Sequence, residues 1–410
     1  MRYVIIGNAA AAVGCLEGIR RVDPKGPITV VSSEPYHTYG RPLISYLLYG
    51  KTTESRMQYR PADFYEKNGC EALLGRTAVS IDAHEHTVTL DNGAQLAYDK
   101  LLVATGSRPF VPPMSGLDTV QNKHTFMTLD DAKGLEKTLT KQSRVLVVGA
   151  GLIGLKCVEG ILDRCASVTV ADLSDRILPS ILDEDGAALV QRSLEEKGVR
   201  FLLSDSVKRF SAHTAQMNSG QSVAFDALVI AVGVRPNVEL LEKAGGCVEK
   251  GIITDDTGLT SLPDVYAAGD CTESKDIASG QRRILALLPN AYLQGECAGQ
   301  NMAGANVSYT NAIPLNAIGF FGLHLCTAGC YDGEAIVRRG PGRYKKLFVK
   351  DNLLKGYILI GEIERAGIYT AMIRDRVPLD SVDFELLCER PQLMAFSRQE
   401  RAKQLGGVAR

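Results

Sequence analysis

The chain has 410 residues, of which 46 are Lys or Arg and 47 are Asp or Glu. This length allows roughly two to three domains with cores of their own, and the balanced charge does not favour a nucleic-acid partner. No segment reaches the ~18 consecutive apolar residues of a membrane helix. The first residues enter a strand pattern directly, so we expect no signal peptide, no membrane span and a cytoplasmic protein.

The first predicted strand leads into a helix through a loop of small residues, and this segment reads Val4-Ile5-Ile6-Gly7-Asn8-Ala9-Ala10-Ala11-Ala12. Small residues permit a tight turn and close approach to a pyrophosphate, whose charge is stabilised by free N–H groups and the positive dipole end of the helix. Alanine replaces two glycines of the G-x-G-x-x-G pattern, which makes the loop less specific. The next strand, 28–31, leads to Glu34, which is either a ligand of a ribose or a cap of a helix or turn.

A second strand-to-helix loop carries the complete pattern, Gly149-Ala150-Gly151-Leu152-Ile153-Gly154. It follows Thr128–Asp131 and a charged helical stretch that we interpret as a hinge into a separate domain. The next strand, 167–171, ends in Asp172. A carboxylate there accepts hydrogen bonds from a ribose 2′-hydroxyl and repels a 2′-phosphate, which predicts a preference for NADH over NADPH. The alternative is that Asp172 is a solvated turn residue.

Strands and helices alternate up to about residue 305, which is the pattern of parallel α/β units. After residue 313, short strands separated by turns predict an antiparallel sheet followed by helices. The unit around Gly149 closes near Val232 and Gly233, so we expect it to be inserted in the first domain. The predicted domains are residues 1–110 with 233–308, residues 111–232, and a C-terminal α+β domain at 309–410.

Ten cysteines lie along the chain without a C-x-x-C pair. This argues against a metal site, an iron–sulfur cluster or a thioredoxin-type couple in this chain. Cys326 and Cys330 are the closest pair, and we expect both to be ordinary buried thiols.

Three further segments carry a wider pattern, and they are Tyr98–Pro109, Phe225–Asn237 and Asp264–Asp270. Together with both loops they resemble the pyridine nucleotide–disulfide oxidoreductase family over nearly the whole chain. The resemblance implies two Rossmann-like domains, the second inserted in the first, with FAD on the Gly7 loop and NAD(H) on the Gly149 loop. It also implies that Asp270 accepts a hydrogen bond from the ribityl chain of FAD.

Residues 34–46 and 316–329 are similar to NADH:rubredoxin reductases, ferredoxin reductases and the flavin part of NADH-dependent nitrite reductases. The last domain of such relatives often forms a dimer, so we expect a homodimer. The motifs and the resemblance together assign cofactor contacts to Gly7, Asn8, Ala9, Ala10, Ala11, Ala12, Glu34, Arg41, Pro42, Ser45, Val79, Ala104, Thr105, Gly106, Gly269, Asp270, Leu288, Gly149, Gly151, Leu152, Ile153, Gly154, Asp172, Val232 and Gly233.

Disulfide reductases of this family carry a cysteine over the flavin. In this chain Tyr39 stands in the corresponding segment, and no cysteine lies between Cys15 and Cys70. A relay through a thiol is therefore not expected. Electrons would leave the flavin for an acceptor outside the chain.

The ferredoxin-reductase relatives pair a lysine at the end of an R-P-x-L-S-K segment with a glutamate on the second loop's helix. Here Tyr46 replaces that lysine and Lys156 replaces that glutamate, which makes Lys156, Tyr46 and Tyr39 the candidate catalytic residues. One interpretation places Lys156 over the N5 edge of the flavin, hydrogen-bonded to Tyr46. The other is a surface ion pair with Glu159, worth ~0.2–0.5 kcal/mol.

Arg41 has two interpretations as well. It binds the FAD pyrophosphate, or it stabilises the negative charge at N1 of reduced flavin, together with the N-terminus of a helix that runs from about Asn290 to Gly304.

The sequence thus predicts an FAD-dependent NADH oxidoreductase that passes electrons to a small redox protein, rubredoxin-like or ferredoxin-like, or to a partner enzyme subunit. The alternatives are direct reduction of a small molecule or O₂ by the flavin, and a non-enzymatic subunit that carries flavin for a structural or sensor role.

Overall fold

The computed structural model describes residues 1–405, which form two compact units. The first unit comprises residues 1–180, 194–274 and 282–310, and the second comprises residues 181–193, 275–281 and those from 311 onward. Among the described residues, every helix is too short or too polar to cross a membrane.

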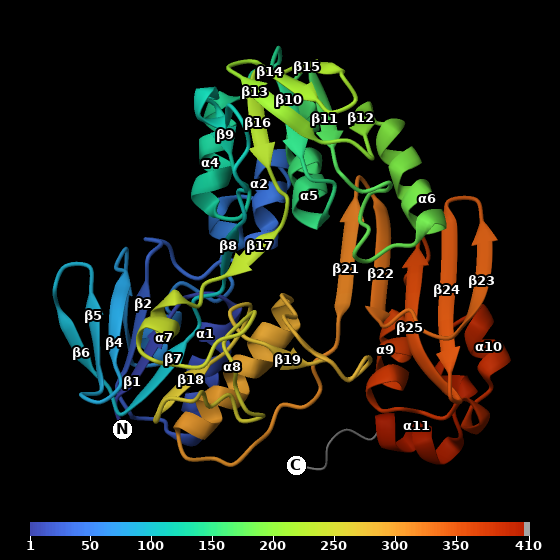
Figure 1. The fold of residues 1–410 in the computed structure, drawn as a ribbon. Helices are drawn as coiled ribbons and strands as arrows, with labels where there is room; N and C mark the ends of the chain where they lie inside the picture. The colour runs from blue at the N-terminus through green and yellow to red at the C-terminus, as the bar shows by residue number, and fades with distance from the viewer. Residues whose placement is uncertain (406–410) are drawn as a thin grey trace. The chain divides into compact units, whose positions relative to one another are not determined.

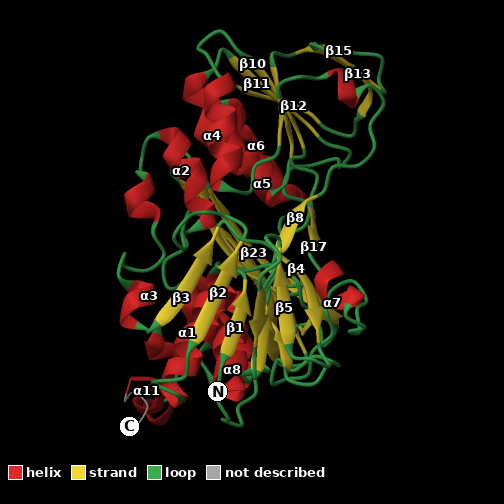
Figure 2. Cartoon of the chain, turned by 90° about the vertical axis from the view of Figure 1, so that its left-hand side faces the viewer, coloured by secondary structure: helices red, strands yellow, loops and turns green. Residues whose placement is uncertain are grey.

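A parallel five-stranded sheet forms the base of the first unit, in the order β18-β7-β1-β2-β3 (Figures 1 and 2). Its strands are β1 (Tyr3–Ile6), β2 (Ile28–Ser32), β3 (Cys70–Leu74), β7 (Lys100–Val103) and β18 (Val265–Ala267). All four residues of β1 are buried, because helices and loops cover both of its faces.

Two helices of this unit, α1 (Ala10–Val22) and α8 (Leu288–Met302), pack with their backbones in contact. A Cβ atom on Gly14 or Gly18 of α1 would overlap a carbonyl oxygen of α8, and a Cβ atom on Gly295 or Gly299 of α8 would overlap a carbonyl oxygen of α1. The glycines therefore set how closely the two helices lie. The N-terminus of α8 is in this way brought beside that of α1.

A second parallel sheet has the order β12-β11-β10-β16-β9. Its strands are β9 (Lys123–His124), β10 (Arg144–Val148), β11 (Ser167–Ala171), β12 (Val199–Leu202) and β16 (Ala227–Ile230), and it carries the helices α4 (Leu129–Thr138) and α5 (Leu152–Ile161). All five strands lie between β7 and β18 in the sequence. The predicted insertion of one Rossmann-like sheet within the chain of another is confirmed.

The predicted hinge in the helical stretch that begins at Thr128 is wrong. Thr128 caps α4, since its side chain accepts a hydrogen bond from the Asp131 N–H while the Asp131 carboxylate accepts one from the Thr128 N–H. The chain instead passes between the two sheets at the paired strands β8 (Ser107–Pro109) and β17 (Val234–Pro236), which run antiparallel.

Smaller elements complete the first unit. They are α2 (Ile44–Tyr49), α3 (Phe64–Lys67), α7 (Glu239–Lys243), β19 (Ser274–Lys275) with β20 (Arg282–Arg283), and two three-stranded antiparallel sheets formed by β4 (Ala78–Asp82), β5 (Thr87–Leu90) and β6 (Gln95–Ala97) and by β13 (Val207–Ser211), β14 (Thr214–Met217) and β15 (Ser222–Ala224).

The second unit contains an antiparallel sheet in the order β21-β22-β25-β24-β23, followed by helices, as predicted. Its elements are β21 (Leu315–Phe320), β22 (Leu323–Gly329), β23 (Glu334–Gly340), β24 (Arg343–Lys350), β25 (Leu353–Ile360), α9 (Ala366–Arg374), α10 (Phe384–Glu389) and α11 (Arg398–Leu405). Cys326 is buried in the core of this unit and Cys330 packs against it partly buried, which agrees with two ordinary thiols.

The helix α6 (Glu184–Glu195) begins within the second unit, although its sequence lies inside the predicted range 111–232. Asp183, which precedes the helix, accepts hydrogen bonds from Tyr344 Oη at 2.6 Å and Lys346 Nζ at 2.7 Å. Lys346 and Tyr344 lower the pKa of this carboxyl despite its partial burial. The start of α6 is thus fastened to β24.

Candidate cofactor-binding site

A cavity of about 270 Å³ opens in the first unit at the carboxyl ends of the strands of the first sheet. Ligands of parallel α/β sheets bind at this edge. Of the residues assigned to cofactor contacts from the sequence, those that line it are Gly7, Asn8, Ala9, Ala10, Ala11, Glu34, Arg41, Ala104, Thr105, Gly106, Gly269, Asp270 and Leu288.

Twelve predicted contacts do not line this cavity: the eight assigned to the second sheet, from Gly149 to Gly233, and also Ala12, Pro42, Ser45 and Val79. Val79 is 47% exposed, and its neighbour Ala78 lines the cavity instead. The side chain of Ser45 donates to the Pro42 carbonyl within its own turn.

The two glycine-rich loops share one construction. Gly7 has φ +122°, and a Cβ atom on it would overlap the carbonyl oxygen of Ala104 at the end of β7. Gly149 has φ +115°, and a Cβ atom on it would overlap the carbonyl oxygen of Ala231 just after β16. Glycine is required at both positions because L-residues rarely adopt this conformation and the neighbouring backbone leaves no space.

The helices that follow these loops begin without a capping side chain. Ala9 precedes α1 and Gly151 precedes α5, and neither provides a side-chain acceptor for the first N–H groups. These N–H groups can donate hydrogen bonds to a pyrophosphate, and the positive end of the helix dipole stabilises its negative charge. Leu152 and Ile153 are the first residues of α5, and Gly154 lies so close to Gly149 that a side chain there would overlap the Gly149 carbonyl.

Asp270 lines the cavity with one long hydrogen bond, from Ser107 Oγ to its Oδ2 at 3.3 Å. Burial raises the pKa of this carboxyl, while Ser107 and the positive charge of Arg41 act in the opposite direction. This partly buried carboxylate makes little hydrogen bonding within its own chain, so it can accept a hydrogen bond from a hydroxyl group of a ligand. The Gly7 loop, the uncapped α1 and Asp270 together fit FAD.

Twelve lining residues were not assigned from the sequence, among them the polar residues Ser107 and Asn237. Asn237 donates from Nδ2 to the Thr105 carbonyl at 2.9 Å, and Thr105 Oγ1 donates to the Asn237 carbonyl at 2.6 Å. Both residues belong to segments that carried the family resemblance. Their polar side chains beside Gly106 and Pro236 were the available signal.

Glu34, Tyr39 and Arg41 form a cluster at one side of the cavity. Glu34 accepts a hydrogen bond from Tyr39 Oη at 2.6 Å and forms an ion pair with Arg41. Tyr39 Oη also accepts from the Leu129 N–H, at 3.0 Å, in the first turn of α4. Burial and the Glu34 carboxylate raise the pKa of Tyr39, which therefore stays a neutral phenol. Tyr39 lines a small neighbouring pocket rather than the main cavity.

Asp172 is bound to the glycine-rich loop of the second sheet. Its Oδ2 accepts from the Ala150 N–H at 2.6 Å and its Oδ1 from the Ser174 N–H at 2.7 Å. The carboxylate is therefore fixed beside the loop, which disfavours the alternative of a solvated turn residue. Gly233, with φ +119°, follows Val232 after β16 on the neighbouring strand.

Lys156 and Glu159 form an ion pair on α5. The predicted surface location of this pair is wrong, since the side chains are only 12% and 3% exposed. The cause is α2, which packs so tightly on α5 that a Cβ atom on Gly160 would lie 2.9 Å from the Ser45 carbonyl oxygen. Lys156 Nζ lies 4.3 Å from the centre of the Tyr46 ring, so these residues meet in a cation–π contact.

The ten cysteines are free thiols. Within the part of the chain that the structure describes, there is no group of three His, Cys, Asp or Glu side chains placed to hold a metal ion.

The chain has two parallel sheets, and in each a glycine-rich loop precedes the first turn of a helix. A carboxylate lies at the rim of each of the two sites. These features define a flavoprotein reductase with two dinucleotide sites. The chain belongs to the pyridine nucleotide-disulphide oxidoreductase family, whose model matches residues 1–295. The C-terminal domain of rubredoxin NAD+ reductase matches residues 314–377.

Two relatives of similar sequence differ in length. The NADH-dependent phenylglyoxylate dehydrogenase subunit epsilon of Aromatoleum evansii is 31% identical over 92% of each chain. The assimilatory nitrate reductase electron transfer subunit of Bacillus subtilis is 32% identical over 92% of this chain but only 49% of its own length, so this chain spans about half of that relative.

Among solved structures, the putidaredoxin reductase–putidaredoxin complex covers 99% of both chains with a TM-score of 0.88 and 24% identity. The NAD-dependent persulfide reductase of A. fulgidus covers 94% of this chain and 79% of its own, with a TM-score of 0.86 and 28% identity. The protein is thus an oxidoreductase that binds FAD and NADH and passes electrons from NADH through the flavin to an external acceptor.

Proposed function

We propose that the external acceptor is a small redox protein or the redox centre of a partner enzyme subunit. The observation that carries this proposal is the absence of a cysteine from residues 16–69, which removes the thiol relay of the disulfide reductases. Two relatives support it, since one is named as an electron transfer subunit and one as subunit epsilon of a dehydrogenase.

When bound, FAD accepts a hydride from NADH and can return electrons to an acceptor. In the proposed site the uncapped N–H groups of α1 bind the pyrophosphate of FAD, and Asp270 accepts from a hydroxyl of its ribityl chain. Arg41 pairs with Glu34 and lines the same cavity as Asp270, where its guanidinium can bind the pyrophosphate or the flavin ring. Asp172 binds the ribose of NADH. A crystal structure with FAD in which the Arg41 guanidinium lies more than ~6 Å from both groups would exclude both roles.

Replacing Asp172 with Ser is expected to reduce the preference for NADH over NADPH by about 10–100-fold, because one charge-assisted hydrogen bond to the ribose and the repulsion of a 2′-phosphate are both lost. The ratio of kcat/KM for the two nucleotides measures the change. Asp175→Asn is the matched control, since Asp175 is 64% exposed and pairs with Arg176. An unchanged ratio in Asp172→Ser would remove Asp172 from the nucleotide site.

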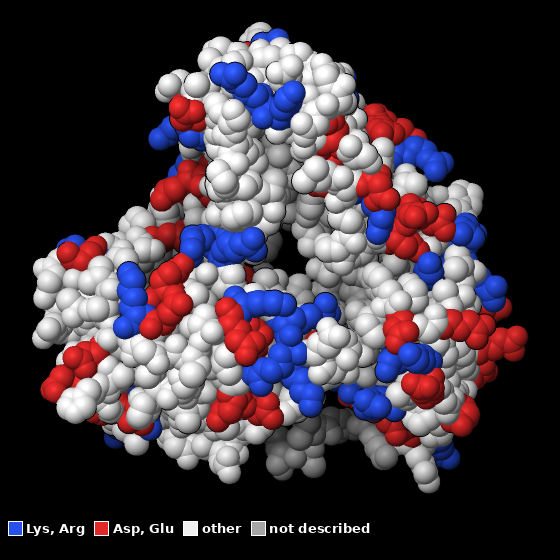
Figure 3. Space-filling view, in the orientation of Figure 1, with Lys and Arg blue, Asp and Glu red and all other residues white. Residues whose placement is uncertain are grey.

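A docking surface for the acceptor is proposed around the exposed residues Arg282 and Arg283 of β20. Figure 3 shows Lys and Arg gathered near the middle of the face it presents, amid mixed charges elsewhere. Arg283 precedes Leu288, which lines the cofactor cavity, by five residues, so it is within ~17 Å of that residue. A basic surface this near the cavity suits an acidic redox protein.

The double variant Arg282→Glu/Arg283→Glu is expected to raise the KM for an acidic rubredoxin-type acceptor about fivefold or more at low salt, and much less at ~0.5 M salt, because exposed charges are then screened. Flavin reduction by NADH should not change. Lys208→Glu/Arg209→Glu, on the exposed surface of β13, makes the same charge change elsewhere as a control. Equal effects of both double variants would contradict a local docking surface.

Reoxidation kinetics test the proposed acceptor class. The protein is reduced anaerobically by NADH in a stopped-flow instrument and mixed with either a rubredoxin-type protein or air-saturated buffer. Faster reoxidation by the protein acceptor is expected. Faster reoxidation by O₂ would favour the alternative of an oxidase, a function named for the relative from Methanocaldococcus jannaschii, which is 31% identical over 75% of this chain.

We also propose that the protein is a cytoplasmic homodimer with the domain limits 1–110 with 233–308, 111–232 and 309–410. The match of residues 314–377 to a separate C-terminal domain supports the last limit. Light scattering after gel filtration, which gives twice the chain mass for a dimer, tests the oligomeric state.

A further inference from the structure

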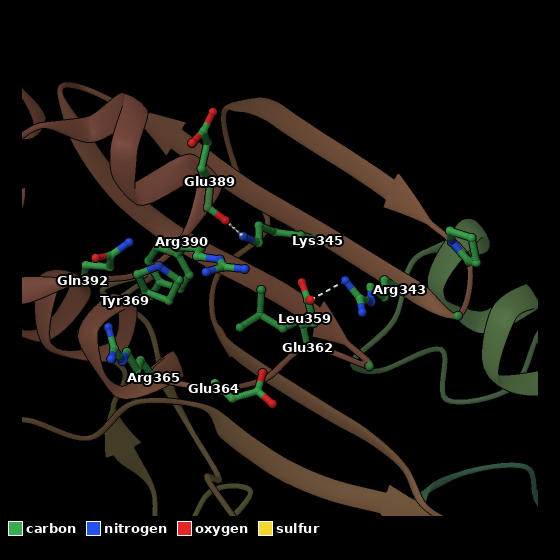
Figure 4. Close-up of a pocket in the computed structure, with 14 residues that line it drawn as sticks. Arg343, Lys345, Leu359, Glu362, Glu364, Arg365, Tyr369, Glu389, Arg390 and Gln392 are labelled. Carbon is green, nitrogen blue, oxygen red and sulfur yellow. Dashed lines mark hydrogen bonds and ion pairs between the residues drawn. The ribbon is translucent and has the colours of Figure 1, made fainter.

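A second cavity, of about 790 Å³, lies within the C-terminal unit. Its walls come from the turn between β23 and β24, the end of β25, the start of α9 and the residues after α10 (Figure 4). None of its lining residues lines the cofactor cavity. Its volume is in the range of small-molecule sites.

Four cations line this cavity: Arg343, which pairs with Glu362, and Lys345, Arg365 and Arg390. Within the described residues, the guanidinium groups of Arg365 and Arg390 have no hydrogen-bond or ion-pair partner. In Figure 4 the side chain of Arg390 extends between Lys345 and Leu359. Two guanidinium groups without an acidic partner are available to a ligand, and their planar donor geometry matches carboxylate and phosphate oxygens.

Lys345 adds a charge that no carboxylate neutralises. Its Nζ donates to the backbone carbonyls of Cys388 at 3.2 Å and Glu389 at 2.7 Å. Burial lowers the pKa of Lys345, and the positive charges of Arg338 and Arg390 lower it further, against the effect of Glu362. Lys345, bound to backbone carbonyls, thus contributes a positive potential at this end of the cavity.

The acidic residues of the lining do not cancel that potential. Glu362 forms an ion pair with Arg343, and Figure 4 shows the carboxylate of Glu389 turned away from Lys345. Glu364 lies on the other side of Leu359 from Arg390. Apart from the Arg343–Glu362 pair, the lining therefore holds three cations and the carboxylate of Glu364, with that of Glu389 turned away.

An apolar surface lies beside the cavity. Leu359 and Tyr369 back its wall but are themselves buried, so the apolar surface open to a ligand lies in the adjoining pocket. Arg365 and Gln392 border a neighbouring pocket of about 570 Å³ as well, which is otherwise lined by Gly367, Ile368, Leu393 and Met394. Cationic and apolar surfaces therefore meet at Arg365.

We propose that this cavity binds a small organic anion, a carboxylate or a phosphate ester that carries an apolar group. Arg390 and Lys345 bind the anionic group, and the apolar group extends past Arg365 toward Ile368 and Leu393. Charge-assisted hydrogen bonds from the guanidinium stabilise the bound anionic group, and burial of apolar surface stabilises the bound apolar group.

Calorimetric titration of the FAD-loaded protein tests this proposal with four probes: phenyl phosphate, benzoate, inorganic phosphate and benzyl alcohol. Saturable binding of phenyl phosphate or benzoate is expected, and the tighter of the two identifies the head group. Inorganic phosphate lacks the apolar part and benzyl alcohol lacks the charge, so each should bind at least about tenfold more weakly. Absence of saturable binding for both aromatic anions would overturn the proposal.

Variants locate the binding. Arg390→Gln and Lys345→Gln are each expected to raise the Kd of the tighter anion at least about tenfold, as for loss of one charge-assisted hydrogen bond. Arg209→Gln, an exposed arginine of β13 in the first unit, is the matched control and should bind like the unaltered protein. Wild-type affinity in both cavity variants would place the ligand elsewhere and refute the site. The titration needs neither NADH nor an acceptor, so its failure leaves the proposed electron transfer untouched.

Discussion

Gly7→Ala is expected to yield a protein that is purified without FAD, whereas Gly149→Ala is expected to retain FAD but to lose its reduction by NADH. In each variant the new Cβ atom overlaps a backbone carbonyl of the adjacent strand, and the residue must keep a positive φ at a cost of about 1–3 kcal/mol. The glycine loop must therefore shift away from its pyrophosphate. The flavin absorbance of the purified proteins and its bleaching by anaerobic NADH measure both effects.

Gly151→Ala is the control for this pair. Its φ is −81°, and a Cβ atom there has no neighbour within 4 Å. The variant should keep the melting temperature of the unaltered protein, and any weaker binding of NADH would reflect the approach of the pyrophosphate itself. If Gly149→Ala lost FAD and Gly7→Ala kept it, the assignment of the two cofactors to the two loops would be reversed.

Lys156→Met is expected to lower the free energy of unfolding by about 3–5 kcal/mol, because it leaves the carboxylate of Glu159 buried without its ammonium partner. The double variant Lys156→Met/Glu159→Leu should recover most of this loss. We expect the double variant still to be reduced by NADH at least about tenfold more slowly, which corresponds to ~1.4 kcal/mol of activation free energy. Denaturant unfolding and stopped-flow reduction measure the two quantities separately.

Tyr46 provides the matched comparison for Lys156. Tyr46→Phe keeps the ring that Lys156 Nζ contacts, and so should leave the reduction rate unchanged, whereas Tyr46→Leu should slow it. A double variant at Lys156 and Glu159 with the wild-type reduction rate and flavin potential would show that the pair is only structural.

The sequence located the cofactor loops because their signals are local. A β-branched run, a glycine and an uncapped helix are contiguous in the chain, and Asp172 follows at the end of the next strand. The fold class followed from the same regularities, since alternating strands and helices require parallel sheets. Asp270 was assigned through the family resemblance, and it lines the cavity with Gly7.

The contacts that the sequence missed are set by packing between segments far apart in the chain. Burial of the Lys156–Glu159 pair depends on α2, more than 100 residues earlier. The attachment of Asp183 to Tyr344 and Lys346 joins residues separated by 161 and 163 positions. Periodicity and motif spacing carry no information at such separations.

The contact between α1 and α8 extends the cofactor site to residues that never touch a ligand. Gly18 and Gly299 lie about two and three turns from the N-terminal helix ends that border the cavity, yet each allows close contact between the two backbones. A methyl group at either position would push α1 and α8 apart. The larger distance between the helices would also displace their N-terminal ends, which border the cavity. The packing of α1 against α8, away from the cavity, therefore contributes to the affinity for the flavin nucleotide.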